Sequence, residues 1–137
     1  MQYAIEIKNL CKQYPKFALQ SVSFTLPMGY IMGFIGENGA GKTTVMKSML
    51  HLVRPDSGMV LLLGQDATKE NAALKQQIGV VPQNVAVFHE LSVEDNINYF
   101  CGLYVSDKAK RKTLVDEAIR FVSLEEFRKF RPGKLSG

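Results

Sequence analysis

The chain has few of the features that mark disulfide-stabilised, zinc-binding or membrane-spanning proteins. Its 137 residues include two cysteines, Cys11 and Cys101, which are far apart and form no C-x-x-C pair. They therefore indicate neither a disulfide framework nor a zinc site, and we expect two free, partly buried thiols in a reducing compartment. The longest apolar runs, such as residues 59–63, are far shorter than the ~20 residues of a membrane helix.

Targeting signals and a strong charge are also missing. The first six residues lack the basic and apolar segments of a secretory signal, so we expect a soluble, cytoplasmic protein. The net charge is +4, and the excess lies in residues 106–137, which carry nine basic and five acidic residues. Such a segment can bind nucleic acid or anionic lipid, but the interspersed acidic residues favour a solvated helix face. No nucleic-acid partner is expected.

What the sequence does contain is a complete G-x-x-x-x-G-K-[ST] phosphate-binding loop at residues 36–43. The apolar stretch 30–35 before it predicts a buried strand, and apolar residues at helical spacing over 43–52 predict a helix after it. A glycine-rich turn that binds nothing is the alternative, and chance produces this pattern in roughly one chain in a few hundred. The strand–loop–helix context therefore favours nucleotide binding.

Each residue type in the loop has a chemical reason. Gly39 and Gly41 permit the tight turn that directs backbone N–H groups at phosphate oxygens. The N-terminus of the following helix adds a partial positive charge at the same place. The Lys42 ammonium can reach the β- and γ-phosphates, and the Thr43 hydroxyl can ligate Mg²⁺.

The remaining pattern divides the chain into a layered part and a helical part. Apolar alternation or short apolar runs predict strands at 2–8, 19–26, 59–63 and 78–81, and a short polar helix is predicted near 70–76. After residue 83, Ser92 is the predicted N-cap of a helix whose apolar stripe is 93, 97, 100, 101 and 104. A second helix is predicted at about 107–122, with its apolar side at 114, 118, 121 and 122, and a short third helix at 124–129. The fold class is therefore α/β, with antiparallel elements at its start and a helical subdomain after it.

Three further segments narrow the family. Residues 81–83 read Val-Pro-Gln and follow a predicted strand, Leu-Ser-Gly at 135–137 ends the sequence, and Tyr14 precedes Lys42 by 28 residues. In this order and spacing, and with the phosphate loop, the chain resembles the nucleotide-binding domain of ABC transporters. In that family a Q-loop and an L-S-G-G-Q signature follow the phosphate loop. The resemblance covers the whole chain.

The resemblance implies a P-loop NTPase fold with N-terminal antiparallel strands. It assigns residues 1–83 to a partial ATP-binding core and residues 84–137 to a truncated helical subdomain that ends at the signature motif. Together they form one incomplete nucleotide-binding domain.

The resemblance also implies a role for each matching residue. Tyr14 stacks its ring on the adenine, as an aromatic face does on any base. Gln83 contacts Mg²⁺ or the attacking water, and Ser136 and Gly137 face the ATP held by a second nucleotide-binding domain. The triphosphate is held by Gly36, Asn38, Gly39, Ala40, Gly41, Lys42, Thr43 and Thr44.

Partners follow from the same resemblance. A separate membrane subunit places short helices against the helical subdomain, and ATP-driven closure of two domains drives transport. The protein is then cytoplasmic and peripheral on the inner face of the cell membrane. Apolar residues 85, 87, 88 and 91 form either part of that docking groove or ordinary core, and both readings stay open. The spelling of residues 38–41 and 91–96 looks most like bacterial export-type members.

The sequence ends within the signature motif, before the family's catalytic carboxylate and switch histidine. Hydrolysis needs metal charge, an oriented water and a closed site. The family's members are ATPases, but we expect these 137 residues to bind Mg-ATP weakly, not to hydrolyse it, and to be marginally stable.

Two other functions stay open. One is a short, non-catalytic product that binds nucleotide or the membrane subunit, and the other is a soluble ABC ATPase acting in translation or DNA repair. A small-molecule kinase is disfavoured because no acceptor site is recognisable, and a GTPase because no Asn-Lys-x-Asp segment occurs. The transported substrate, and a homodimer versus a heterodimer, do not follow from the sequence.

Overall fold

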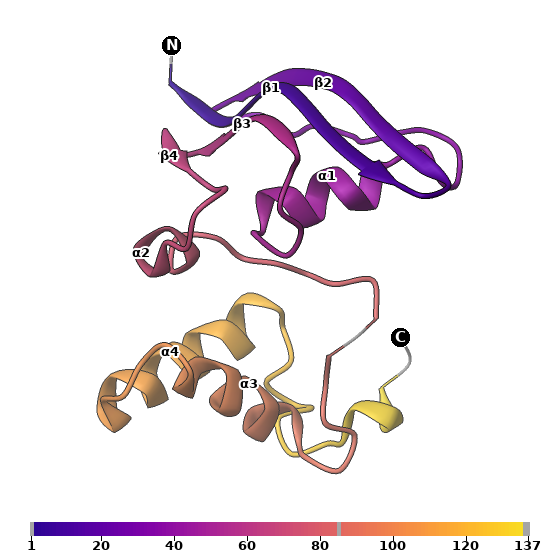
Figure 1. The fold of residues 1–137 in the computed structure, drawn as a ribbon. Coiled ribbons are helices and arrows are strands. Elements are labelled where there is room, and N and C mark those ends of the chain that lie inside the picture. The colour runs from indigo at the N-terminus through magenta and orange to yellow at the C-terminus, as the bar shows by residue number, and fades with distance from the viewer. Residues whose placement is uncertain (1, 85, 136–137) are drawn as a thin grey trace. The chain divides into compact units, whose positions relative to one another are not determined.

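The structure, a computed structural model, describes residues 2–84 and 86–135 of the chain (Figure 1). The chain forms two compact units, residues 1–78 and residues 79–137, which are described separately below. The sequence-based division after residue 83 stays a prediction. Within the described ranges, no helix combines the length and the apolar character that crossing a membrane requires.

The first unit is built on a four-stranded antiparallel sheet. Its order is β2 (Phe17–Pro27), β1 (Tyr3–Tyr14), β3 (Ser57–Leu62) and β4 (Gln65–Asp66). The strands predicted at 2–8, 19–26 and 59–63 are therefore present, and the first two are longer than predicted. They extend because β1 and β2 form one long hairpin that closes where Tyr14 pairs with Phe17.

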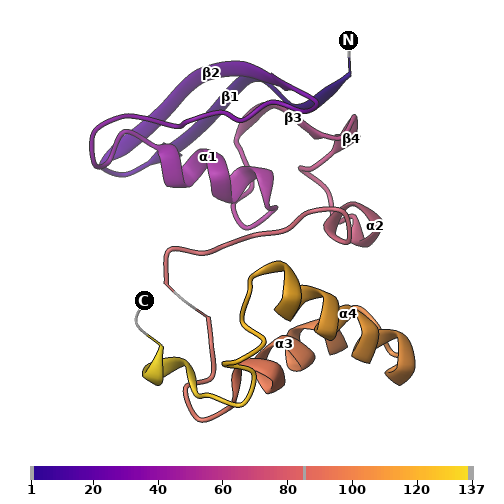
Figure 2. The ribbon, with the colours of Figure 1, turned by 180° about the vertical axis from the view of Figure 1, so that it is seen from behind.

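Two helices complete the first unit. Helix α1 (Lys42–Met49) lies along one face of the sheet, as both ribbon views show, and α2 (Ala72–Lys75) is a single turn capped by the Asn71 side chain (Figures 1 and 2). The core consists of apolar side chains from the sheet, α1, α2 and the residue after β4: Ile7, Leu10, Leu19, Val45, Val60, Leu62, Ala67 and Leu74.

The predictions of strands at 30–35 and 78–81 are wrong. Neither segment has regular structure, and Ile35 and Val81 are each 97% exposed. A strand persists through ladder hydrogen bonds to a neighbour, and no strand among the described residues pairs with either segment. Apolar character alone therefore does not produce a strand here.

The second unit is helical. It contains α3 (Val93–Gly102), α4 (Lys108–Phe121) and a 3₁₀ turn, η1 (Pro132–Lys134). The Ser92 hydroxyl accepts the Asp95 N–H at 3.1 Å, which confirms the predicted N-cap of α3. The Asp107 carboxylate caps α4 in the same way, by accepting the Lys110 N–H at 2.7 Å.

Two predictions for the second unit are wrong. The buried face of α4 is centred on Val115 and Ile119, whereas Phe121 is 90% exposed. The predicted apolar side is therefore offset by about one residue from the buried face: Leu114 and Ala118 are half-buried, whereas Val122, at the C-cap, is exposed. Residues 124–129 form successive turns instead of a helix, and the backbone hydrogen bonds within this segment span three residues, as from Phe127 to Leu124.

Candidate nucleotide-binding site

The phosphate loop adopts the backbone conformation that its glycines permit. Gly39 and Gly41 have φ of +87° and +97°, in the left-handed region that other residues avoid. The Ala40 N–H donates to the Glu37 carbonyl oxygen at 3.2 Å, which tightens the loop, and Gly41 is followed directly by α1. The loop therefore makes a sharp turn immediately before α1.

The Lys42 side chain folds back on the loop and binds its backbone. Its ammonium donates to the carbonyl oxygens of Gly36, at 2.5 Å, and of Glu37, at 2.6 Å. These are carbonyl acceptors on the exposed rim of the loop, so an incoming anion can replace them as partners of the ammonium. The loop therefore holds a positive charge where its backbone turns.

The first turn of α1 adds to this charge. It contains no acidic residue, so the positive end of the helix dipole is not compensated by a side chain of that turn. Thr43 is exposed there, and its hydroxyl is accessible to a ligand. Thr44 is half-buried, and its carbonyl oxygen accepts the Ser48 hydroxyl at 2.9 Å inside the helix. Asn38 and Ala40 lie exposed in the preceding turn.

The hairpin of β1 and β2 connects Tyr14 to this loop through Phe17. Tyr14 stacks on Phe17, with ring centroids 6.2 Å apart and an interplanar angle of 29°. A Cβ added at Gly41 would lie 2.8 Å from both Phe17 Cζ and Leu19 Cδ1, so these side chains pack directly on the loop backbone. Phe17 thus connects the predicted aromatic residue to the predicted phosphate loop.

Phe17 and Leu19 are the residues of this site that sequence reasoning missed. They are two residues apart, a spacing that places them on one face of β2. This alternation could have indicated their role in the site, but it is equally typical of ordinary core residues in a strand.

Three other predicted site residues, Gln83, Ser136 and Gly137, do not belong to the unit that contains the phosphate loop. Gln83 belongs to the second unit, where it is exposed at a bend. Ser136 and Gly137 lie outside the described residues, as does Val85 of the suggested docking groove. Of that groove, Val87 and Leu91 are half-buried, and Phe88 is exposed.

A buried asparagine organises the segment that contains Phe88. Asn96 on α3 is 5% exposed, and its side-chain oxygen accepts the Phe88 N–H at 2.8 Å. Its amide donates to the carbonyl oxygens of Phe88, Leu91 and Ser92, the first and last at 3.0 Å. The Phe88 ring packs edge-on against Tyr99, with centroids 4.9 Å apart. Sequence reasoning gave Asn96 no role.

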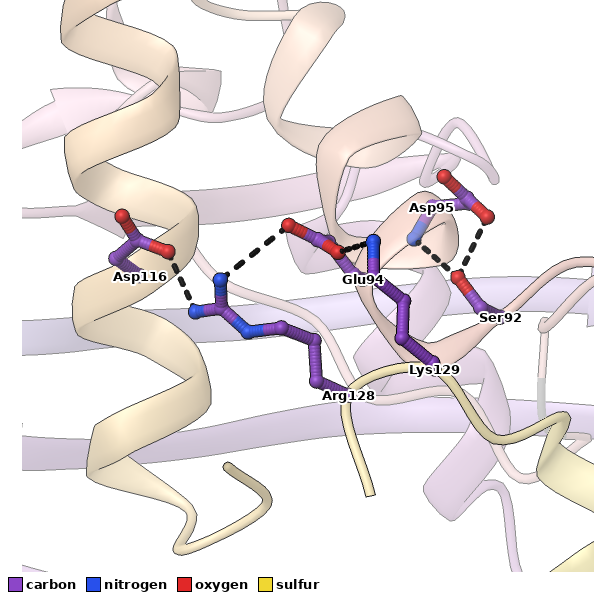
Figure 3. Close-up of polar contacts among 6 residues, drawn as sticks. All are labelled: Ser92, Glu94, Asp95, Asp116, Arg128 and Lys129. Carbon is purple, nitrogen blue, oxygen red and sulfur yellow. Dashed lines mark hydrogen bonds and ion pairs between the residues drawn. The ribbon is translucent and has the colours of Figure 1, made fainter. Parts of the chain in front are cut away.

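An ion-pair network connects Arg128 and Lys129 to α3 and α4 (Figure 3). Arg128 donates to Asp116 on α4 at 2.5 Å and to Glu94 on α3 at 3.4 Å, and Lys129 also pairs with Glu94. The hydrogen bond with Asp116 raises the pKa of Arg128 above its ordinary value. Two of the surplus basic residues of segment 106–137 are therefore paired, which agrees with the solvated-face reading.

Metal ligands of the usual kind do not gather in residues 2–84 and 86–135. No group of three or more histidine, cysteine, aspartate or glutamate side chains there could hold a metal ion. His51 instead lies 3.2 Å from a Glu70 carboxylate oxygen. Cys11 and Cys101 are free and half-buried, as the sequence predicted.

Comparison with known proteins decides the family. The ABC transporter family matches residues 19–137. The chain belongs to this family. A probable multidrug ABC transporter ATP-binding protein of Escherichia coli is 35% identical over 136 residues, which cover 97% of this chain and 24% of that protein. The sulfate/thiosulfate import ATP-binding protein CysA of Mycobacterium bovis is 34% identical over 138 residues, which cover 100% of this chain and 39% of that protein.

A solved structure agrees with the fold of this ABC family chain. The structure of cbiO1 from Clostridium perfringens, part of the ABC transporter complex cbiONQ, superposes with a TM-score of 0.83 at 21% identity. The match covers 99% of this chain and 57% of cbiO1. The fold is therefore α/β, a partial P-loop NTPase core with N-terminal antiparallel strands plus helices. The chain spans about a quarter to two fifths of the two relatives named above.

Proposed function

We propose that this chain is the ATP-binding, energy-coupling part of an ABC transporter and binds Mg-ATP at residues 36–44, with Tyr14 against the base. The observation that carries the proposal is the junction of hairpin and loop. Phe17 contacts both the Tyr14 ring and the Gly41 backbone, so a base platform and a phosphate loop form one surface in a chain of this family.

The phosphates are proposed to bind where Lys42 now meets carbonyl oxygens. In the complex, the ammonium exchanges the Gly36 and Glu37 carbonyl oxygens for phosphate oxygens, which carry more negative charge. The left-handed glycines direct backbone N–H groups toward the same anion, and the α1 dipole has the favourable sign.

Mg²⁺ fits this arrangement as a companion of the nucleotide. In such sites the ion is held mainly by substrate phosphates and water, with one or two protein ligands. The exposed Thr43 hydroxyl on the first turn of α1 is the proposed ligand in the first unit. Gln83 is the proposed second ligand and the group that orients the attacking water.

The partners proposed for the whole protein are a membrane subunit and a second nucleotide-binding domain, which Ser136 and Gly137 face. The protein then sits in the cytoplasm, on the inner face of the membrane. We propose export as the direction of transport, from the spelling of residues 38–41 and from the multidrug name of the E. coli relative. The Mycobacterium bovis relative is named for import at nearly the same identity, so only a transport assay separates the two directions.

The experiment is purification of the full-length protein from membranes, followed by ATP-driven transport in vesicles. We expect co-purification with an integral-membrane subunit and transport that Lys42→Met abolishes. Lys47→Met is the matched control, because Lys47 is an exposed lysine on the same helix. Co-purification with ribosomes or DNA in place of a membrane protein would contradict the proposal.

Hydrolysis by the 137 residues alone is a separate question. The prediction that they bind ATP without turnover is tested by steady-state phosphate release. Turnover that depends on Lys42 would show the prediction to be wrong.

A further inference from the structure

The start of β3 lies close to β1, at the irregularity of their pairing between Lys8 and Cys11. Gly58 has φ of +97°, and a Cβ added there would lie 2.4 Å from the Asn9 carbonyl oxygen and 2.6 Å from Leu10 Cα. The Asp56 N–H donates to the Cys11 carbonyl oxygen at 3.0 Å. Only glycine at position 58 allows this approach, and the approach fixes Asp56 beside the last residues of β1.

The Asp56 carboxylate then binds β1 through both oxygens. Oδ2 accepts the Gln13 backbone N–H at 2.7 Å, and Oδ1 accepts the Lys12 ammonium at 2.7 Å. Hydrogen bonds from Lys12 and Gln13 lower the pKa of Asp56, so the carboxylate is ionised at neutral pH. Asp56 therefore holds the two residues that come directly before Tyr14.

Lys12 connects this clamp to the Tyr14 ring. Its ammonium lies 5.9 Å from the ring centroid, within the range of a cation–π contact. The Lys12 side chain is only 21% exposed. Tyr14 in turn stacks on Phe17, which packs on Gly41 of the phosphate loop. A continuous series of contacts thus runs from Asp56 to the loop.

We propose that Asp56 is a positioning residue for nucleotide binding: it holds Lys12 and Gln13 so that the Tyr14 ring faces the base beside the phosphate loop. The inference rests on the proposed function, since it assumes that Tyr14 stacks on the base. Asp56 acts through Tyr14 and does not touch the nucleotide.

The test compares two ligands on the full-length protein, a non-hydrolysable ATP analogue and inorganic tripolyphosphate, each with Mg²⁺. Tripolyphosphate offers a comparable phosphate chain without a base. Base–aromatic stacking is worth about 1–3 kcal/mol, so Tyr14→Ala should weaken binding of the ATP analogue by about 5-fold to 150-fold and leave tripolyphosphate binding unchanged. Asp56→Asn should weaken only the ATP analogue, by roughly threefold to tenfold, because it loosens the ring without removing it.

A double variant shows through which residue Asp56 acts. In the Tyr14→Ala background, Asp56→Asn should cause no further loss of affinity for the ATP analogue. Asp66→Asn is the matched control, because Asp66 also accepts a backbone N–H and a side-chain hydrogen bond, both from Thr68, and should leave both affinities unchanged. Lys12→Met, which leaves the Asp56–Gln13 bond in place, serves if Asp56→Asn does not fold, and it should reproduce a part of the selective loss.

The outcomes separate the two proposals. If Asp56→Asn lowers the affinities for both ligands equally, the positioning role is overturned, since the result would indicate damage to the phosphate loop. A selective loss in Tyr14→Ala without one in Asp56→Asn would also overturn it, while base stacking would stand. If Tyr14→Ala changes neither affinity, base stacking by Tyr14 is wrong, and the inference about Asp56 is wrong with it.

Discussion

Replacing Gly41 by alanine tests whether the β1–β2 hairpin packs on the phosphate loop. Gly41 and Gly39 both have left-handed φ, so alanine is strained at either position. They differ in their surroundings, because a Cβ at Gly41 meets Phe17 and Leu19 at 2.8 Å whereas a Cβ at Gly39 meets no heavy atom within 4 Å. Gly39→Ala is therefore the matched control for Gly41→Ala.

The expected destabilisation follows from two contributions. The left-handed conformation costs an alanine about 1–2 kcal/mol, and this cost is common to both variants. Overpacking adds about 1–3 kcal/mol at Gly41 alone, because Leu19 is 6% exposed and belongs to the core, so it has little room to move. The lower unfolded-state entropy of alanine offsets part of the destabilisation, by the same amount in both variants. Gly41→Ala should thus be less stable than Gly39→Ala by about 1–3 kcal/mol.

Urea unfolding of the two variants, followed by circular dichroism, measures this difference directly. The slopes should match, so that a lower midpoint for Gly41→Ala reports stability alone. Equal midpoints would refute the reasoning, since they would mean that Phe17 and Leu19 do not press on Gly41. The hairpin would then not hold Tyr14 beside the loop.

Three further predictions concern stability. Asn96→Leu should destabilise the second unit by about 2–4 kcal/mol in urea unfolding, because it leaves the buried partners of Asn96 unpaired, whereas exposed Asn98→Leu should have little effect. Arg128→Met should lower stability at low salt, and its difference from the unmodified protein should shrink in high salt, because its ion pairs are partly exposed and screened. Hydrogen bonds lower the pKa of Asp56 and Asp66 from 3.8, so their contribution to stability is complete above about pH 4 and is lost as pH falls through the lowered values. The urea midpoint should therefore fall below about pH 4, and it should fall less steeply in Asp56→Asn.

The phosphate loop and the helix starts could be predicted because their signals are local. A left-handed glycine, a serine cap and a lysine at a helix N-terminus act within a few residues of themselves. The structure accordingly has left-handed Gly39 and Gly41 before α1, and Ser92 at the start of α3. Such local interactions can be predicted from the sequence because all the residues involved are neighbours along the chain.

The failed strand predictions and the missed roles of Asp56 and Asn96 depend on partners outside the local segment. Residues 30–35 have the apolar character of a strand, but no described strand bonds to them. The roles of Asp56 and Asn96 were missed for the same reason, since Asp56 binds β1 across 43 residues and Asn96 binds a loop eight residues away. An aspartate in a turn and an asparagine in a helix carry no sign of such partners.

The most direct test of the account is ATP binding by Lys42→Met and Lys47→Met, measured by equilibrium dialysis with Mg²⁺. Hydrogen bonds to charged groups are worth about 1.5–3 kcal/mol, so Lys42→Met should weaken ATP binding by about 10-fold to 150-fold. Lys47→Met should bind as the unmodified protein does, because Lys47 is exposed in the last turn of α1. Unchanged ATP affinity in Lys42→Met, or an equal loss in both variants, would contradict the claim that residues 36–44 hold the phosphates.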